Sequence, residues 1–260
     1  MAGPAEPSGL HHVRVETGRV ARLVLDRPPV NVMHLDMLAE MNQGLDSIAA
    51  ADPAVVVIEA TGRTFSAGVD IADHTGDRIE QMLASFHDVF RRLDRLPAPV
   101  IAVVQGAALG GGCELATACD LVVAARGATF GQPEIRLGAF PPVAAVELPR
   151  VMPPRRAAEM LFTGEALSAD EAAAAGLVNR VHDDATFRDE AEAFIGLVSR
   201  HSAVVLALTK AALRMGRGRP LHEALPDVEC LYLDRLMQTH DAREGITAFM
   251  EKRPPVFSDA

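Results

Sequence analysis

The chain has 260 residues, of which 49% are hydrophobic, and its formal net charge is -10 at pH 7. This length fits one large domain or one domain with an appendage, and the acidic balance argues against nonspecific binding to nucleic acid or to an anionic membrane surface. The chain has no Trp and a single Tyr, Tyr232, so stacking on bases is not expected. We therefore predict neither a nucleic-acid partner nor a membrane partner.

The cysteines and the start of the chain predict a cytoplasmic protein. Cys113, Cys119 and Cys230 are an odd number without metal-ligand spacing, which indicates reduced thiols in a cytosolic protein. Residues 1–11 lack the basic and apolar regions of a signal peptide, and no apolar run reaches the ~18 residues of a membrane span. The histidines show no H-E-x-x-H pattern, and we predict no metal site.

After a predicted loose tail over residues 1–9, the first half of the chain alternates strands and helices. Period-2 or continuous apolar runs indicate strands, and apolar residues at helical spacing indicate amphipathic helices. The predicted order is strands at 13–16 and 20–25, a helix at 35–48, a strand at 54–60, a glycine-containing loop at 61–70 and a helix at 79–93. A strand at 100–104, a short helix at 114–118 and a strand at 121–124 follow. This alternation predicts an α/β fold.

From residue 141 onward the pattern is mostly helical. Ser168 and Glu171 form a capping box, and Gly176 stands where that helix should end. A short strand at 177–181 and a helix at 187–198 follow, and then three further helices at 203–215, 221–237 and 241–251. We predict a core over residues 1–200 and a C-terminal helical region over 201–260, whose helices could pack on the core or on a neighbouring subunit.

Three consecutive glycines, Gly110 to Gly112, stand at a predicted strand-to-helix junction. Each glycine inside a helix costs about 1 kcal/mol relative to alanine, so three together need a reason. One reading is a tight turn with close packing; the other is a backbone whose N–H groups face a ligand oxygen. A P-loop would need Gly-Lys-Ser/Thr and a dinucleotide site G-x-G-x-x-G, and neither is present.

A second loop of small residues, 65–71, also follows a predicted buried strand, which is where α/β proteins tend to place ligands. One N–H from each loop would make a two-donor oxyanion hole. Ser66 is not predicted to be a nucleophile, because Thr64 stands where G-x-S-x-G needs its first glycine. We interpret Ser66 as a loop residue close to the substrate.

Two carboxylates accompany these loops. Glu114 follows the glycines directly, and Glu134 lies in the stretch 130–135 with apolar neighbours. Alone, each is more often a solvated or capping glutamate. Together, beside an oxyanion hole, they could share a water molecule and move its protons.

Six stretches in this order resemble the enoyl-CoA hydratase/isomerase, or crotonase, family. They are 65–71 (FSAGVDI), 104–118 (VQGAALGGGCELATA), 130–137 (FGQPEIRL), 160–164 (MLFTG), 176–181 (GLVNRV) and 244–254 (EGITAFMEKRP). They run over nearly the whole chain, and the combination is far more specific than one glycine run.

The resemblance implies a spiral of strand-strand-helix turns with a C-terminal helical region, assembled as homotrimers or homohexamers. It implies an acyl-CoA thioester substrate and no cofactor apart from the coenzyme A of that substrate. The family's oxyanion donors fall on the backbone N–H groups of Val69 and Gly111, and its two glutamates on Glu114 and Glu134, of which we favour Glu134 for the α-carbon. The residues expected around the substrate are Ser66, Ala67, Gly68, Asp70, Gly110, Pro133, Phe140 and Pro142.

Both glutamates are present, which favours a hydratase over a double-bond isomerase or a thioester hydrolase of the same family. A non-catalytic binding protein on the same fold is the alternative from another class. Typical hydratases carry a glycine-rich stretch where this chain has residues 140–146, and a lysine that often follows the Ala-Asp-Ile motif is missing. Residues 27–32, residues 68–70 with 74–75, and residues 140–143 resemble the cyclohexadiene-carbonyl-CoA hydratase branch of the family. The two prolines and the apolar side chains of 140–143 predict a shaped, apolar acyl pocket.

Overall fold

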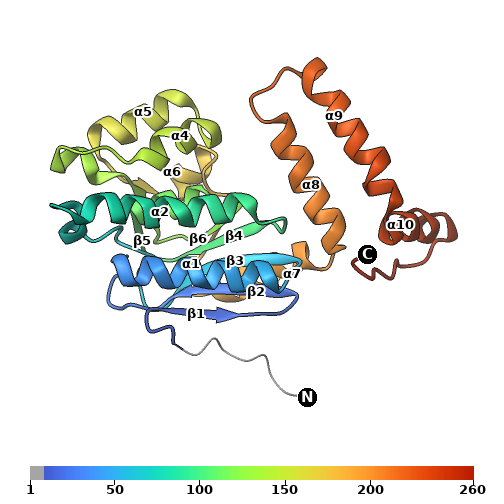
Figure 1. Cartoon of the computed structure of the whole chain (residues 1–260), viewed down its shortest axis with the longest axis horizontal. Helices are drawn as coiled ribbons and strands as arrows, with labels where there is room; N and C mark the ends of the chain where they lie inside the picture. The colour runs from blue at the N-terminus through green and yellow to red at the C-terminus, as the bar shows by residue number, and fades with distance from the viewer. Residues whose placement is uncertain (1–8) are drawn as a thin grey trace.

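The computed structural model describes residues 9–260 (Figure 1), so all but the last residue of the predicted tail lies outside the described part. A six-stranded sheet in the order β1-β2-β3-β4-β6-β9 forms the centre of the fold. Its strands are β1 Val13–Glu16, β2 Val20–Leu25, β3 Val55–Ala60, β4 Val100–Val104, β6 Leu121–Ala125 and β9 Arg180–His182. Only the β1–β2 pair is antiparallel; the other neighbours are parallel. The predicted strands at 13–16, 20–25, 54–60, 100–104 and 121–124 are therefore confirmed, and the first two form a hairpin.

A second, three-stranded sheet in the order β5-β7-β8 lies beside the first. Its strands are β5 Ala107–Leu109, β7 Thr129–Gly131 and β8 Leu167–Ser168. The sequence analysis missed all three, because runs of two or three residues carry no readable period. Strand β5 separates β4 from the glycine triplet, so the triplet follows β5 and not β4 directly. Since β4 is followed by β5 and β6 by β7, the chain passes from the large sheet to the small one twice in succession.

Helices cover both faces of the large sheet, which explains why the central strands β4 and β6 are continuously apolar. On one face α1 Leu35–Ala50 and α2 Arg78–Arg95 lie side by side (Figure 1). The core side chains of α1 are buried as its spacing predicted: Leu38, Met41, Leu45 and Ile48. On the other face α7 Phe187–Ser199 packs against the strands, and its contacts are Phe187, Ala191 and Ile195.

Short helices join the remaining strands. They are η1 Ile71–His74, α3 Gly111–Thr117, η2 Pro133–Leu137, α4 Pro142–Val151, α5 Pro154–Thr163 and α6 Ala169–Ala174. The capping box of Ser168 and Glu171 is present at the start of α6. Strand β9 begins three residues later than predicted, because Leu177 and Val178 donate their N–H groups to the Ala172 carbonyl and continue the turn that ends α6.

The C-terminal helices form an arm that stands beside the layered core (Figure 1). They are α8 Ala203–Gly216, α9 Leu221–Asp234, η3 Leu236–Gln238 and α10 His240–Glu251. The predicted helix 221–237 is thus interrupted at Asp234. Lys210 of α8 is only 5% exposed, and its Nζ donates to the Ala98 carbonyl at 2.8 Å. The division into 1–200 and 201–260 stays a prediction.

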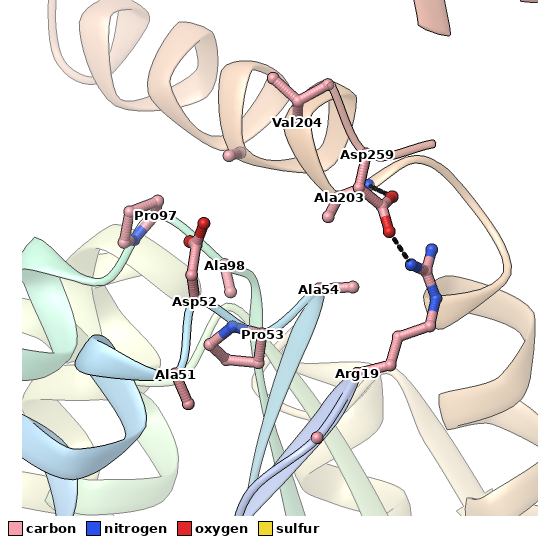
Figure 2. Close-up of a pocket in the computed structure, with 12 residues that line it drawn as sticks. Arg19, Ala51, Asp52, Pro53, Ala54, Pro97, Ala98, Ala203, Val204 and Asp259 are labelled. Atoms are coloured by element: carbon pink, nitrogen blue, oxygen red, sulfur yellow. Dashed lines mark hydrogen bonds and ion pairs between the residues drawn. The ribbon is translucent and has the colours of Figure 1, made fainter. Parts of the chain in front are cut away.

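A cavity of about 300 Å³ lies where the arm meets the core (Figure 2). Arg19, in the β1–β2 turn, donates to the carbonyls of Ser199 and His201 at 2.9 and 2.7 Å and forms an ion pair with Asp259. The other carboxylate oxygen of Asp259 accepts the N–H of Ala203 at 2.7 Å. The end of the chain therefore fastens the first turn of α8 to the core.

Over residues 9–260, the structure contains no single helix with the length and hydropathy of a membrane span. Helices α7 and α8 meet that criterion only as a pair, and they are bent by 91° relative to each other.

Candidate active site

The two predicted loops lie against each other. Ser66 and Ala108 form an isolated parallel bridge, and the Leu109 N–H donates to the Ser66 carbonyl at 3.0 Å. A Cβ added at Gly112 would lie 2.5 Å from the Ser66 carbonyl oxygen, and one added at Gly68 would lie 2.9 Å from the Leu109 carbonyl oxygen. No side chain fits at either position, so these glycines allow the two backbones to approach. The two readings of the glycine triplet, close packing and N–H groups that face a ligand, are therefore compatible with each other.

The N–H groups of Val69 and Gly111 are free donors in this arrangement. Met33 pairs with the peptide groups on either side of Val69: its N–H donates to the Gly68 carbonyl at 2.9 Å, and its carbonyl accepts the Asp70 N–H at 3.0 Å. Gly111 is the first residue of α3, where an N–H has no acceptor within the helix. Within residues 9–260 neither N–H donates a hydrogen bond. A Cβ at Gly68 would lie 3.4 Å from the Gly111 nitrogen, which places the two donor segments next to each other.

Glu114 is the first carboxylate of the site. It lies on α3 and is 2% exposed. Its Oε1 accepts the Ala144 N–H at 2.8 Å, one of the N–H groups at the start of α4 that have no acceptor within that helix. Burial raises the pKa of this carboxyl group to about 7, and the nearby Glu134 contributes in the same direction, while the Ala144 N–H partly opposes the change.

Glu134 is the second carboxylate and lies in the first turn of η2. The chain reverses at Gly110, whose φ of 50° and ψ of -125° suit glycine, and a Cβ there would lie 2.4 Å from Glu134 Oε1. Glu134 Oε2 is buried without a hydrogen-bond partner among residues 9–260. Burial raises the pKa of Glu134, and the charge of His74 partly opposes this.

Together these groups can stabilise an anionic oxygen and move a proton. Two adjacent N–H donors suit an oxygen that gains negative charge during a reaction. The two carboxyl groups lie around the same glycine turn, and a raised pKa lets a carboxyl group hold or release a proton near neutral pH. Among residues 9–260 no cluster of three or more His, Cys, Asp or Glu side chains has the arrangement of a metal site.

The other predicted site residues lie around this centre with different exposures. Ser66 is fully buried; its Oγ donates to the Asn31 carbonyl at 2.8 Å and accepts the Gly68 N–H at 3.1 Å, so its hydroxyl supports the loop. Ala67 is exposed, and the Asp70 carboxylate accepts the Ala72 N–H at the start of η1. Pro133 and Pro142 begin η2 and α4, and Phe140, between these two helices, is 71% exposed.

Sequence reasoning missed several residues that shape the site. Asn31 entered the sequence analysis only as part of the stretch 27–32, yet it is fully buried and bonded to the loop that leads to Ser66. Met33 and Ala144 act through backbone groups, which any residue type could supply. A buried asparagine cannot be distinguished from an exposed one by its position after Pro28-Pro29. The one available signal was the polar residue within an otherwise apolar Pro-Pro-Val-Asn-Val-Met stretch.

Because the pKa of Glu114 is raised, the difference in unfolding free energy between wild type and Glu114→Gln should depend on pH. The folded pKa of about 7 exceeds the ordinary 4.5, so the folded state binds this proton more tightly than the unfolded state does. The resulting stabilisation is complete below the unfolded pKa and is lost as the pH rises through the folded pKa. Relative to Glu114→Gln, the wild-type free energy of unfolding should fall by on the order of 3 kcal/mol between about pH 4 and pH 8. Urea unfolding of both proteins measures this, and a difference that is constant with pH would contradict the burial argument.

The comparisons with known proteins agree with this fold. The family model for enoyl-CoA hydratase/isomerase matches residues 16–260. The cyclohexa-1,5-dienecarbonyl-CoA hydratase of Thauera aromatica is 38% identical over 240 residues, which cover 91% of this chain and 92% of that protein. The crotonyl-CoA hydratase of Syntrophomonas wolfei is 36% identical over 247 residues, covering 92% and 94%. A crystal structure of an enoyl-CoA hydratase subunit from Geobacillus kaustophilus superposes with a TM-score of 0.90 at 35% identity, covering 97% and 100%.

These matches define the class of the protein: the chain belongs to the enoyl-CoA hydratase/isomerase family. The predicted crotonase fold is confirmed by the solved structure that it matches over nearly its full length. The relatives named as hydratases confirm the prediction of a hydro-lyase enzyme.

Proposed function

We propose that this protein is an enoyl-CoA hydratase that adds water across the α,β double bond of an enoyl-CoA thioester. The observation that carries the proposal is the pair of unused N–H donors at Val69 and Gly111 with the buried Glu114 and the half-buried Glu134 beside them. An isomerase needs one group to move one proton between two carbons. Water addition needs a base that takes a proton from the water and an acid that gives a proton to the α-carbon. Two carboxyl groups can fill these two roles, and one cannot fill both at the same time.

In this proposal the thioester carbonyl oxygen lies between the N–H groups of Val69 and Gly111. These donors stabilise the negative charge that develops on the oxygen when hydroxide adds to the β-carbon. Coenzyme A enters and leaves as part of the substrate, and no separate cofactor takes part. We further propose that the protein is cytoplasmic.

We assign water activation to Glu114 and protonation of the α-carbon to Glu134. Burial raises the pKa of both carboxyl groups, so the assignment rests on their hydrogen bonds. Glu134 Oε2 is buried without a partner, and the lack of a donor to stabilise its charge favours a protonated acid. Glu114 Oε1 is held by the Ala144 N–H, a contact that favours the carboxylate form of a base. As the oxygen of water bonds to the β-carbon, its proton passes to Glu114, and the proton of Glu134 passes to the α-carbon. Solvent exchange then restores both carboxyl groups.

Mixing the protein with crotonyl-CoA tests the activity directly. Hydration removes the conjugated double bond, so the enoyl-thioester absorbance should fall until equilibrium is reached. A matched sample of butyryl-CoA, which has no double bond, should give no change. Unchanged absorbance with both crotonyl-CoA and cyclohexadiene-carbonyl-CoA at high enzyme concentration would leave only a binding protein or a different chemistry on this fold.

We also propose that the acyl group is a ring or a branched chain. Support comes from residues 140–143, where two prolines fix φ and remove backbone donors, and from the 38% identity to a relative named for a cyclic substrate. The kcat/KM for cyclohexadiene-carbonyl-CoA should exceed that for a long straight-chain enoyl-CoA by about 10- to 100-fold, since a methylene or two in a pocket changes discrimination by this order. A clear preference for the long chain would exclude the ring substrate and leave the hydratase proposal intact.

The assembly is proposed to be a homotrimer or homohexamer. Large apolar side chains on the arm are exposed in the single chain: Leu213 73%, Leu221 75%, Phe249 84%, Met250 76% and Val256 73%. Such a concentration of exposed apolar surface favours burial against another subunit. Sedimentation should give a trimer or hexamer, and deletion from Leu221 onward should give dissociated or insoluble protein. A full-length chain that is active as a monomer would contradict this assembly.

A further inference from the structure

The side chain of Asn31 connects the segment before α1 to the loop over residues 61–70. It is 0% exposed. Its Oδ1 accepts the Arg27 N–H at 2.8 Å, and its Nδ2 donates to the carbonyls of Thr61 and Thr64 at 3.0 and 2.8 Å. All three partners are backbone groups, so they fix the amide in one orientation. The side chain therefore ties the segment before α1 to the segment that follows β3.

The backbone of the same segment reaches the donor loop itself. Asn31 has a φ of 49°, a left-handed conformation that asparagine and glycine tolerate best. Its carbonyl accepts the Ser66 hydroxyl, which in turn accepts the Gly68 N–H. On either side of Asn31, the Val30 carbonyl accepts the Ala67 N–H at 2.9 Å, and the Met33 N–H donates to the Gly68 carbonyl at 2.9 Å.

The bond from Met33 to Gly68 sets the direction of the free donor. The Gly68 carbonyl and the Val69 N–H belong to one planar trans peptide group, so they point in opposite directions. When the Met33 N–H holds the carbonyl on one side, the Val69 N–H must point to the other side. The direction of this donor thus depends on where residues 30–33 lie, and Asn31 fixes that position.

We propose that Asn31 is a positioning residue that orients the Val69 N–H toward the substrate carbonyl. This inference rests on the function proposed above, because it concerns the oxyanion donor of that reaction. Asn31 does not touch the substrate in this account. It acts through Ser66, Met33 and Gly68.

The test is Asn31→Gly, which keeps the left-handed backbone without strain and leaves the residue-31 carbonyl available to Ser66. It removes the buried side chain and with it the three side-chain hydrogen bonds. A donor misplaced by about 1 Å lowers turnover by about 100-fold, so kcat for crotonyl-CoA should fall by about 10- to 100-fold. The dissociation constant of butyryl-CoA should change by less than about 3-fold, since one oriented N–H adds little to binding of the ground state.

A spectroscopic readout separates positioning from general loosening. The absorbance of 4-dimethylaminocinnamoyl-CoA moves to longer wavelength when its thioester carbonyl is polarised by hydrogen-bond donors. Wild-type protein should produce this shift on binding, and Asn31→Gly should bind the probe and lose most of the shift. Asn42→Ala is the matched control, because Asn42 also donates its amide to a backbone carbonyl, that of Ser85 at 2.9 Å, but joins α1 to α2. It should lose stability and retain the shift.

Ser66→Ala keeps the proposal testable if Asn31→Gly does not fold. It removes the hydroxyl that links the Asn31 carbonyl to the Gly68 N–H and should reduce both kcat and the shift in the same direction. A folded Asn31→Gly protein with wild-type kcat and a full shift would overturn the inference, as would equal losses in Asn42→Ala. Wild-type protein that neither hydrates crotonyl-CoA nor shifts the probe would instead refute the proposed function, so the two failures are distinguishable.

Discussion

Glu134→Gln should lower kcat for crotonyl-CoA by about 100-fold or more, and Glu114→Gln should do the same. Glutamine keeps the size of each side chain and removes the group that accepts or releases a proton. Binding of butyryl-CoA should change little, because neither proton transfer takes place in that complex. Stopped-flow absorbance and isothermal titration measure the two quantities.

Glu147→Gln provides the matched control for these variants. Glu147 lies on α4, close in sequence to the Ala144 N–H that holds Glu114, but its carboxylate pairs with Arg150 at 2.6 Å. Loss of this carboxylate should leave kcat within about 2-fold of wild type, since exposed ion pairs contribute little. Near-normal hydration by either Glu114→Gln or Glu134→Gln would refute the two-carboxylate mechanism.

Gly68→Ala should lower kcat for crotonyl-CoA by about 100-fold, the effect expected when an oxyanion donor is displaced. Its Cβ would lie 2.9 Å from the Leu109 carbonyl oxygen. Because that neighbour is backbone, the new methyl group must push the two donor loops apart. A φ of 103° at residue 68 adds conformational strain for alanine.

Gly62→Ala separates the steric effect from this strain. Gly62 belongs to the same loop and also has a positive φ, 76°, but a Cβ there has no atom within 4 Å. Both variants should lose stability, by about 1 kcal/mol or more for the backbone strain, whereas only Gly68→Ala should lose turnover. Equal kcat values in the two variants would show that the approach of the loops is not needed for catalysis.

The sequence predicted those parts of the fold that are encoded in runs of four or more residues. The apolar runs of β3, β4 and β6 were recognisable because strands covered on both faces are apolar throughout. Helices α1 and α2 were recognisable from their spacing. Strands β5, β7 and β8 were missed because they contain two or three residues each and depend on their partners in the small sheet.

The candidate site was also predicted only in part from the sequence. Gly68, Gly110 and Glu114 were predicted from motifs, and the structure supplies reasons for the two glycines, since a Cβ at either would meet a neighbouring atom. The burial of Glu114 could not be predicted, because it depends on α4 packing against α3 and on the Ala144 N–H. The role of Asn31 depends on carbonyl groups 30 and 33 residues further along the chain, and no local pattern encodes such contacts.

The central claim is that this protein adds water to an enoyl-CoA and leaves the thioester intact. Mass spectrometry of the products formed from crotonyl-CoA in water enriched in oxygen-18 tests this claim most directly. The account predicts 3-hydroxybutyryl-CoA that carries one heavy oxygen on its hydroxyl group. Heavy oxygen in a free carboxylic acid with release of coenzyme A would identify a thioester hydrolase, and recovery of acyl-CoA without added water would contradict hydration.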